Sequence, residues 1–377
     1  MSITDEKVAL CALNKIYGFQ PLQGKELLES CSGVSELLSK LDPTELDWAR
    51  KELERVRERG YRFIGYGEED YPAPLLECED PPLGLYLNAV TSPTEIFALR
   101  PMVAFVGTRD MSLYGKEWCI RLVRALADTP VPPCIVSGLA LGVDGIAHRT
   151  ALECGLPTIG VMATGVESIY PWHHRELGLS IVSTPGCGLV TDYPMGTQPL
   201  APHFVRRNRI IAGLSVATIV IESRTRGGSL LTAKYACNYN RDVYALPGRA
   251  DDPRSAGCNS LIHEHMAEII TTPEALAESL GLGAPSRNAG GSWLLPRGGA
   301  SAEEVLRCTL ARRYGPGSLL VDVGLAVLAH RGATPEELAS ALGRPYPDIL
   351  SALGTLEADG VVTTDLLRRC TLAPAFA

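Results

Sequence analysis

The stretch VAFVGTRDMSLYG (residues 103–115) decides how the middle of this 377-residue chain folds. A run of apolar, β-branched residues ends at a glycine, a polar turn follows, and a helical pattern begins. The same order recurs at CIVSG, TIGVMATG, ATIVIES and DVYALPG. Strands that alternate with helices indicate βαβ units. We therefore expect an α/β domain over residues 81–282, with a mostly parallel sheet covered by helices on both faces.

The regions on either side of this domain show other patterns. Residues 1–80 have helical apolar spacing, as in PTELDWARKELERVRERG, and are expected to form a helical N-terminal domain. Residues 283–317 begin with GAPSRNAGGSW, whose Gly, Ser and Pro content is typical of a linker. Residues 318–377 are expected to form a small helical domain closed by a β-hairpin.

Composition narrows the class of protein. With 46 % hydrophobic and 21 % charged residues, the chain can bury a core, which argues against disorder. No apolar run approaches the roughly 20 residues that span a bilayer. The first residues, MSITDEKVALCAL, are acidic where a secretory signal is basic, so we expect a cytoplasmic protein with no membrane contact.

The cysteine pattern indicates neither a disulfide framework nor a metal centre. None of the eleven cysteines forms a CxxC pair, so we expect free thiols that pack as small hydrophobic groups. The nearest approach to a metal cluster is Cys258, His263 and His265, whose spacing matches no known ligand pattern.

Charge is unevenly distributed along the chain, whose formal net charge is -8 at pH 7. Residues 201–254 hold 9 basic and 4 acidic side chains, whereas residues 1–80 hold 10 and 17. One basic segment on an acidic protein is compatible with binding a polyanion at one place. The alternative is that some of these arginines pair with carboxylates on neighbouring elements.

The turn after the first strand contains groups that bind anions. Gly107, Thr108 and Arg109 place backbone N–H groups and a guanidinium at a strand's carboxyl end, where open parallel sheets bind ligands. It is not a Walker-type phosphate loop, because Lys116 is followed by Glu117, where magnesium binding needs Ser or Thr.

Another motif at a strand end is SGLALGVDGIAH, which begins with Ser137 and Gly138. Its glycines allow close backbone approach, but their spacing is not GxGxxG, which disfavours a dinucleotide site. Asp144 can cap the following helix. We interpret His148 on that helix as structural.

The stretch HFVRRNRIIAGLS concentrates basic side chains. Arg206, Arg207 and Arg209 surround Asn208, and Phe204 comes just before them. Neighbouring helix positions point in different directions, so some of these arginines must reach a ligand or a buried carboxylate. Guanidinium groups for phosphates, an aromatic face for a base and an amide for base edges are typical of single-strand binding.

The stretch TRGGSLLTAK follows the strand ATIVIES. Gly228 and Ser229 open a helix there, and its N-terminal amides favour an anion. Lys234 and Arg241 add positive charge near the same sheet edge, although Lys234 alone fits a solvated helix face equally well.

Taken together and in order, these motifs resemble the DprA/Smf family of DNA-processing proteins. The matching stretches are VGTR with Tyr114-Gly115, SGLALGVDGIAH, ATGVESIYP, FVRRNRIIAGLS, GGSLLTAKYA, NRDVYALPG and SAGCNSLI, which run over residues 103–262.

The resemblance implies an extended Rossmann-like, doubly wound sheet that binds single-stranded DNA without a nucleotide cofactor and without catalysis. It also implies a homodimer that protects incoming DNA in natural transformation and loads the RecA recombinase onto it. By motif position, Gly107–Arg109 would hold phosphate, Phe204–Arg209 would meet backbone and bases, and Ser229, Lys234 and Arg241 would stand at the rim.

The alternative from another class is a nucleotide-processing enzyme of the phosphoribohydrolase type on the same kind of sheet. Such enzymes resemble this chain in their glycine-rich loop but carry PGGxGTxxE with a catalytic glutamate. The comparable stretch RGGSLLTAK has no acid, and the sequence shows no GxSxG or HExxH. A transcription regulator that reads DNA with its C-terminal domain is a third possibility.

The C-terminal stretch ATPEELASALGRPYPDILSALGTLEADGVV predicts a helix-turn-helix. Thr334 and Glu337 form a capping-box pattern, and VVTT at the end suits a wing. The stretch resembles the winged-helix domain of many family members. A DNA reader needs basic side chains on the second helix, which here holds Asp348 and Glu357. We therefore expect a structural or protein-contact module.

The resemblance also places the dimer and recombinase contacts at about residues 255–280. There the run LIHEHMAEII offers an apolar stripe, for which burial in the core is an equal alternative. The stripe consists of Leu261, Ile262, Met266, Ile269 and Ile270.

Overall fold

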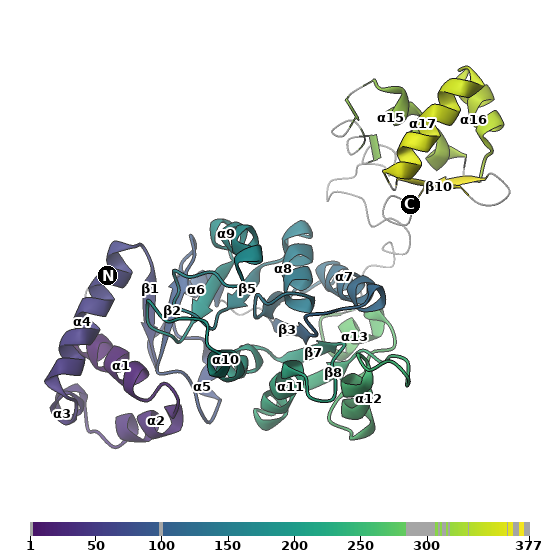
Figure 1. Cartoon of the computed structure of the whole chain (residues 1–377). Coiled ribbons are helices and arrows are strands. Elements are labelled where there is room, and N and C mark those ends of the chain that lie inside the picture. The colour runs from purple at the N-terminus through teal and green to yellow at the C-terminus, as the bar shows by residue number, and fades with distance from the viewer. Residues whose placement is uncertain are drawn as a thin grey trace. The chain divides into compact units, whose positions relative to one another are not determined.

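The computed structural model describes residues 3–97, 101–283 and 306–372, the last with gaps at 308–309, 311–313, 316, 331, 360 and 365–368. The chain divides into two compact units, residues 1–286 and residues 287–377 (Figure 1). No helix in the described part is long and apolar enough to cross a membrane. Within the same residues, no three His, Cys, Asp or Glu side chains are placed to hold a metal ion.

The first unit begins with helices, as the sequence predicts. They are α1 (Asp5–Ile16), α2 (Pro21–Glu29), α3 (Val34–Lys40) and α4 (Pro43–Glu58). Thr4 caps α1 by accepting a hydrogen bond from the N–H of Lys7 at 3.2 Å, and Asp42 caps α4 through the N–H of Thr44 at 2.8 Å. Their apolar faces pack on the sheet that follows.

Over the described residues, nine strands form one sheet in the order β1-β2-β6-β5-β4-β3-β7-β8-β9. β1 pairs antiparallel with β2, and β2 with β6, while the remaining pairs are parallel. The predicted mostly parallel sheet is confirmed. The strands are β1 (Arg62–Gly65), β2 (Gly84–Asn88), β3 (Met102–Gly107), β4 (Cys134–Ser137), β5 (Thr158–Val161), β6 (Gly188–Thr191), β7 (Ala217–Ile221), β8 (Asp242–Ala245) and β9 (Glu268–Ile269).

β1 lies within residues 1–80, for which the sequence pattern indicated helices alone. Its four residues, RFIG, are too few to show the alternation that marks a strand. The sheet therefore begins earlier in the chain than the alternating pattern suggested.

The chain reverses its direction of travel across the sheet. From β3 it proceeds outward to β4, β5 and β6, and it then returns to β7 on the other side of β3. This is the doubly wound arrangement that the resemblance implied. The helices after β3 and β7 cover opposite faces, so a topological switch point lies at the carboxyl ends of these two strands.

Helices cover both faces of the sheet. One face carries α7 (Leu113–Ala127), α8 (Val143–Glu153) and α13 (Pro273–Ser279); the other carries α5 (Ala73–Leu76), α10 (Ala201–Leu214), α11 (Gly228–Asn238) and α12 (Ala256–His263). α6 (Pro93–Ile96) and α9 (Arg175–Ser183) lie toward β6. Along β3, Val103 and Phe105 pack under the first group and Ala104 and Val106 under the second, as strand alternation requires.

The second unit contains α15 (Leu319–Ala329), α16 (Pro335–Leu342) and α17 (Tyr346–Ala358), followed by the antiparallel pair β10 (Val362–Thr364) and β11 (Cys370–Leu372). The predicted capping box is present: Thr334 accepts from the N–H of Glu337, and the Glu337 carboxylate accepts from the N–H of Thr334 at 2.9 Å. The winged-helix assignment stays a prediction. Most of the expected linker, residues 284–305, lies outside the described residues.

We predict that Thr334→Ala lowers the stability of the second unit by about 1 kcal/mol, because the N–H of Glu337 loses the hydroxyl that accepts its hydrogen bond. Amide hydrogen exchange over residues 335–358 measures this directly. Ser340→Ala, an exposed change on the same helix, serves as the control. Equal exchange rates in the two variants would show that the capping box contributes nothing.

Candidate functional site

A groove with a volume of about 780 Å³ lies at the switch point. Its walls come from the turn after β3, the start of α8, one side of α10, and the segment that joins β7 to α11. This is the sheet edge at which the sequence placed two anion-binding turns. Within the described residues it is lined by Gly107, Thr108, Arg109, Asp144, Tyr170, Phe204, Arg207, Asn208, Arg224, Arg226, Gly228 and Ser229, among others.

The turn after β3 packs against the end of β7. A Cβ at Gly107 would lie 2.0 Å from the carbonyl oxygen of Ile221, so only glycine fits there. Thr108 donates its N–H to the carbonyl of Glu222 at 2.8 Å. The buried Glu222 carboxylate accepts from both the N–H and the hydroxyl of Ser112. Glu222, which the sequence analysis did not single out, thus fixes the turn that presents Arg109.

Aromatic rings stand beside this turn. The ring centroids of Tyr170 and Phe204 are 5.6 Å apart, and the guanidinium of Arg109 lies 5.6 Å from the Phe204 ring centroid. Tyr170 is 43 % exposed. The sequence analysis quoted Tyr170 only as part of ATGVESIYP, since a single aromatic residue in a loop gives no signal of its own.

The segment between β7 and α11 forms the opposite wall. Arg224, Thr225 and Arg226 are exposed there, and Arg224 lies 3.9 Å from the carboxylate of Asp110. Ser229 is buried and donates to the hydroxyl of Ser223 at 2.8 Å, so it shapes the wall more than it offers a free hydroxyl. The two arginines entered the sequence analysis only as part of the basic segment.

Arg207 forms the floor of the groove. It is buried, and its guanidinium donates to the carbonyls of Gly138 and Val161 at the ends of β4 and β5, the first at 2.6 Å. A Cβ at Gly138 would lie 2.5 Å from this guanidinium. Burial lowers the pKa of Arg207 to about 10, with nearby Asp144 opposing the shift. Arg207 therefore keeps its charge at neutral pH and also joins α10 to the sheet.

Asp144 is the one carboxylate among the described residues that line the groove. It accepts from the N–H groups of Gly138 and Ala140 at 3.1 and 3.2 Å. Burial raises its pKa, and the charge of Arg207 and these hydrogen bonds oppose that rise. Ser137, just before this turn, is buried and donates to the carbonyl of Phe105 at 2.6 Å.

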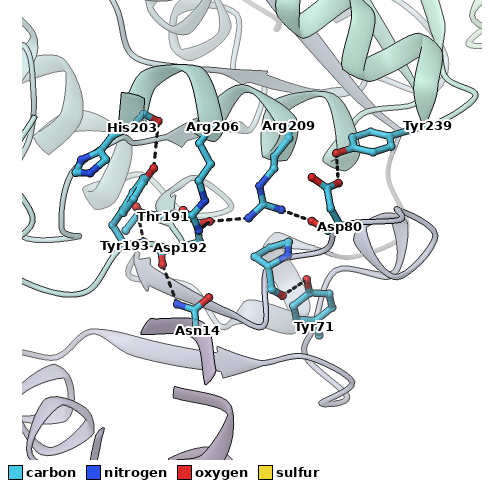
Figure 2. A network of polar contacts seen from close by, with 11 residues as sticks. Asn14, Tyr71, Asp80, Thr191, Asp192, Tyr193, His203, Arg206, Arg209 and Tyr239 are labelled. Carbon is cyan, nitrogen blue, oxygen red and sulfur yellow. Dashed lines mark hydrogen bonds and ion pairs between the residues drawn. The ribbon is translucent and has the colours of Figure 1, made fainter. Parts of the chain in front are cut away.

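Arg206 and Arg209 lie on the far side of α10 from the groove and meet at Asp192 (Figure 2). Both donate to the same carboxylate oxygen of Asp192, Arg209 at 2.7 Å, and Arg209 also donates to the carbonyl of Asp80. The side chain of Asn14 donates to the carbonyl of Asp192 at 2.8 Å. Arg206 and Arg209 therefore follow the alternative given for the basic segment, in which arginines pair with carboxylates on neighbouring elements.

Two other candidates also lie away from the groove lining. Lys234 is exposed on α11. Arg241 is paired with Glu77 at 2.6 Å and donates to the carbonyl of Pro74 at 3.1 Å. The structure therefore brings together Gly107–Arg109, Phe204, Arg207, Asn208 and Gly228–Ser229 in the groove lining. It leaves outside that lining Ser137, Gly138, Arg206, Arg209, Lys234 and Arg241.

The groove lining is strongly cationic for an acidic chain. Arg109, Arg207, Arg224 and Arg226 face it, against the single carboxylate of Asp144 among the described lining residues. The amides at the start of α11 add partial positive charge. The arrangement suits a polyanion with aromatic bases.

Comparison with known proteins agrees with this chemistry. Residues 62–281 match the family described as DNA recombination-mediator protein A. The chain belongs to this family. Outside the matched residues lie α1 to α4 and the second unit.

Named relatives support the assignment. Protein Smf of Synechocystis is 36 % identical over 271 residues, which cover 72 % of this chain but only 63 % of that protein, less than two thirds of its length. Protein Smf of Escherichia coli is 34 % identical over 84 % of this chain and 79 % of its own.

Solved structures of the family share the fold. DNA processing protein A of Streptococcus pneumoniae aligns with a TM-score of 0.57 and 31 % identity, covering 74 % of this chain and 99 % of that one. The Helicobacter pylori protein, whose structure describes a single-stranded DNA binding mode, aligns with a TM-score of 0.52 and 29 % identity, covering 58 % and 95 %.

We predict that Asp192→Ala lowers the free energy of unfolding of the first unit by about 3–5 kcal/mol, because it leaves two buried guanidinium groups without their carboxylate. Chemical denaturation measures the change. Asp251→Ala is the control, since its partner Arg249 is exposed and such pairs contribute at most about 1 kcal/mol. Similar losses in the two variants would contradict a structural role for Asp192.

A second prediction concerns His148, which is buried in α8 and hydrogen-bonded through Nδ1 to the hydroxyl of Thr158 at 2.6 Å. Burial, with a smaller effect of His174, lowers its pKa from 6.5 to about 3. Between these pH values the unfolded state binds a proton that the folded state does not. The free energy of unfolding should therefore fall with decreasing pH, by up to about 1.4 kcal/mol per unit.

Urea unfolding at several pH values measures this slope. In His148→Gln part of the slope should disappear, whereas exposed His263→Gln should keep it. An unchanged slope in the His148 variant would mean that other groups cause the acid sensitivity.

Proposed function

We propose that the groove binds single-stranded DNA and that this chain is a recombination mediator acting on such strands. The observation that carries the proposal is the joint presence of two aromatic rings, exposed Tyr170 and half-buried Phe204, with exposed arginines and helix N-terminal amides in one groove. Phosphates pair with the arginines and amides, while bases stack on the rings of Phe204 and Tyr170. Membership of the family and the single-stranded DNA binding mode described for the Helicobacter pylori relative support it.

The division of labour within the groove follows from exposure. Arg109, Arg224 and Arg226 are exposed and can reach phosphate oxygens directly. Buried Arg207 acts through its field and through the backbone that it holds in place. The side-chain amide of Asn208 donates to the carbonyl of Gly228 at 3.3 Å and joins the two walls. Phosphates and ring faces are common to all sequences, so binding should depend little on base identity.

We infer that the groove binds without turnover and without a nucleotide cofactor. The competing enzyme reading needs a carboxylate free to act on a sugar or phosphate. Asp144, the one carboxylate of the described lining, instead accepts from two amides and lies near Arg207. Because the Asp144 carboxylate is already hydrogen-bonded, the groove is better suited to binding than to hydrolysis.

The finer role follows from the family and is part of the same proposal. The chain would act in the cytoplasm as a homodimer that protects incoming DNA during natural transformation and loads RecA onto it. Most of the apolar stripe expected to form the dimer and recombinase contacts is not accessible to a partner. Leu261 and Ile270 are buried in the core, and Ile262 and Met266 pack against it. Ile269, 50 % exposed, remains available.

The direct test compares single- and double-stranded oligonucleotides of one length at one salt concentration. We predict tighter binding of the single strand, because stacking on Phe204 and Tyr170 requires unstacked bases. Equal affinity for the two forms would contradict the proposal.

Arg109→Ala should weaken binding and reduce the slope of log K against log salt by roughly 0.7, the value of one phosphate contact on single strands. Arg249→Ala, which removes an exposed arginine outside the groove lining, should leave the slope unchanged. Identical slopes in both variants would place Arg109 outside the DNA contact.

A further inference from the structure

We propose that single-stranded DNA leaving the groove crosses the first turns of α10 and stacks a base on Phe19. This inference rests on the proposed function and extends it to the loop between α1 and α2. That loop lies outside residues 62–281, the part of the chain that matches the family.

Phe19 has the form of a stacking platform. Its ring is 62 % exposed, although it is a large apolar group. The guanidinium of Arg206 lies 5.0 Å from the ring centroid, and the ring of His203 lies 5.8 Å from it. Arg206 is itself fixed by Asp192, so the ring rests on a rigid support and is not a freely moving side chain.

An exposed path joins this ring to the groove. Ala201 and Val205 are exposed on α10 and line the groove beside Phe204, and Pro202 between them is also exposed. Arg206, the next residue, already contacts Phe19. The path therefore crosses one helix, about 10 Å wide, which a few nucleotides can span.

The loop is electrostatically suited to a phosphate strand. Residues 16–24, IYGFQPLQG, carry no charge, in a domain that otherwise has an excess of carboxylates. The flanking Lys15 and Lys25 lie 2.7 and 4.0 Å from the carboxylates of Glu45 and Glu29 and offset their charges. A strand on this path meets no unpaired like charge within the loop.

Ile16 and Leu22, 43 % and 48 % exposed, also belong to this surface, so another protein is the alternative binding partner. A protein contact would use the apolar area of all three side chains. A base would use the flat ring of Phe19, which the guanidinium beneath it makes a better stacking surface. Because Arg206 holds the Phe19 ring in place, a stacked base is favoured over a protein contact.

Binding of two oligonucleotides tests the proposal, one of about 4 nucleotides and one of about 16, the usual range of single-strand sites. Phe19→Ala should weaken binding of the long strand about tenfold and leave the short strand unchanged. Phe19→Leu, which keeps apolar area without a ring, should behave like Phe19→Ala, and Phe19→Tyr like the parent. Leu22→Ala is the control and should affect neither strand.

Each outcome is informative. If the parent chain binds neither strand, the proposed function fails. If it binds both and Phe19→Ala leaves the long strand unaffected, or Phe19→Leu binds like the parent, only the Phe19 proposal is overturned. Arg109→Ala provides the contrast, because a groove contact should weaken both lengths. Thermal unfolding of each variant separates lost binding from lost folding.

Discussion

The carboxylate of Asp192, placed between the guanidinium groups of Arg206 and Arg209, fixes the rotation of α10 about its own axis. Buried charges need partners, so these two arginines have one low-energy direction in which to point. Because side chains three or four positions apart share a helix face, this choice turns Phe204 and Asn208 toward the groove. Asn14 ties the N-terminal helices to the same point, so two parts of the first unit share one anchor (Figure 2).

Much of the architecture could be predicted from local patterns. The five central strands follow apolar runs that end in glycine or polar turns, and the capping box at Thr334 lies where its sequence pattern indicates. β1, β2 and β6 were not found this way; the first two pair antiparallel at one end of a largely parallel sheet, outside the alternation of strand and helix that marks the central strands. Their positions depend on tertiary partners rather than on their own sequences.

The groove lies at the sheet edge that the sequence indicated, and it is lined by only part of the residues that the sequence analysis selected. The turns at Gly107 and Gly228 lie where the strand ends indicate. The run RRNR does not by itself show which arginine faces the groove, because Asp192, an earlier residue in the chain, pairs with Arg206 and Arg209 and leaves Arg207 on the groove side. A basic cluster in a sequence therefore combines ligand contacts with structural ion pairs, and only the packing of the helix separates them. Because Arg206 and Arg209 are paired with Asp192, the positive charge of the groove comes instead from Arg109, Arg207, Arg224 and Arg226.

The position of β3 also affects how the chain is made. β3 lies between β4 and β7, yet β7 begins only at Ala217, long after β3 ends at Gly107. As the protein leaves the ribosome, the apolar strand MVAFVG therefore has one unpaired edge until the later part of the sheet has been synthesised. A nascent chain stopped before that point exposes a template for association with other chains.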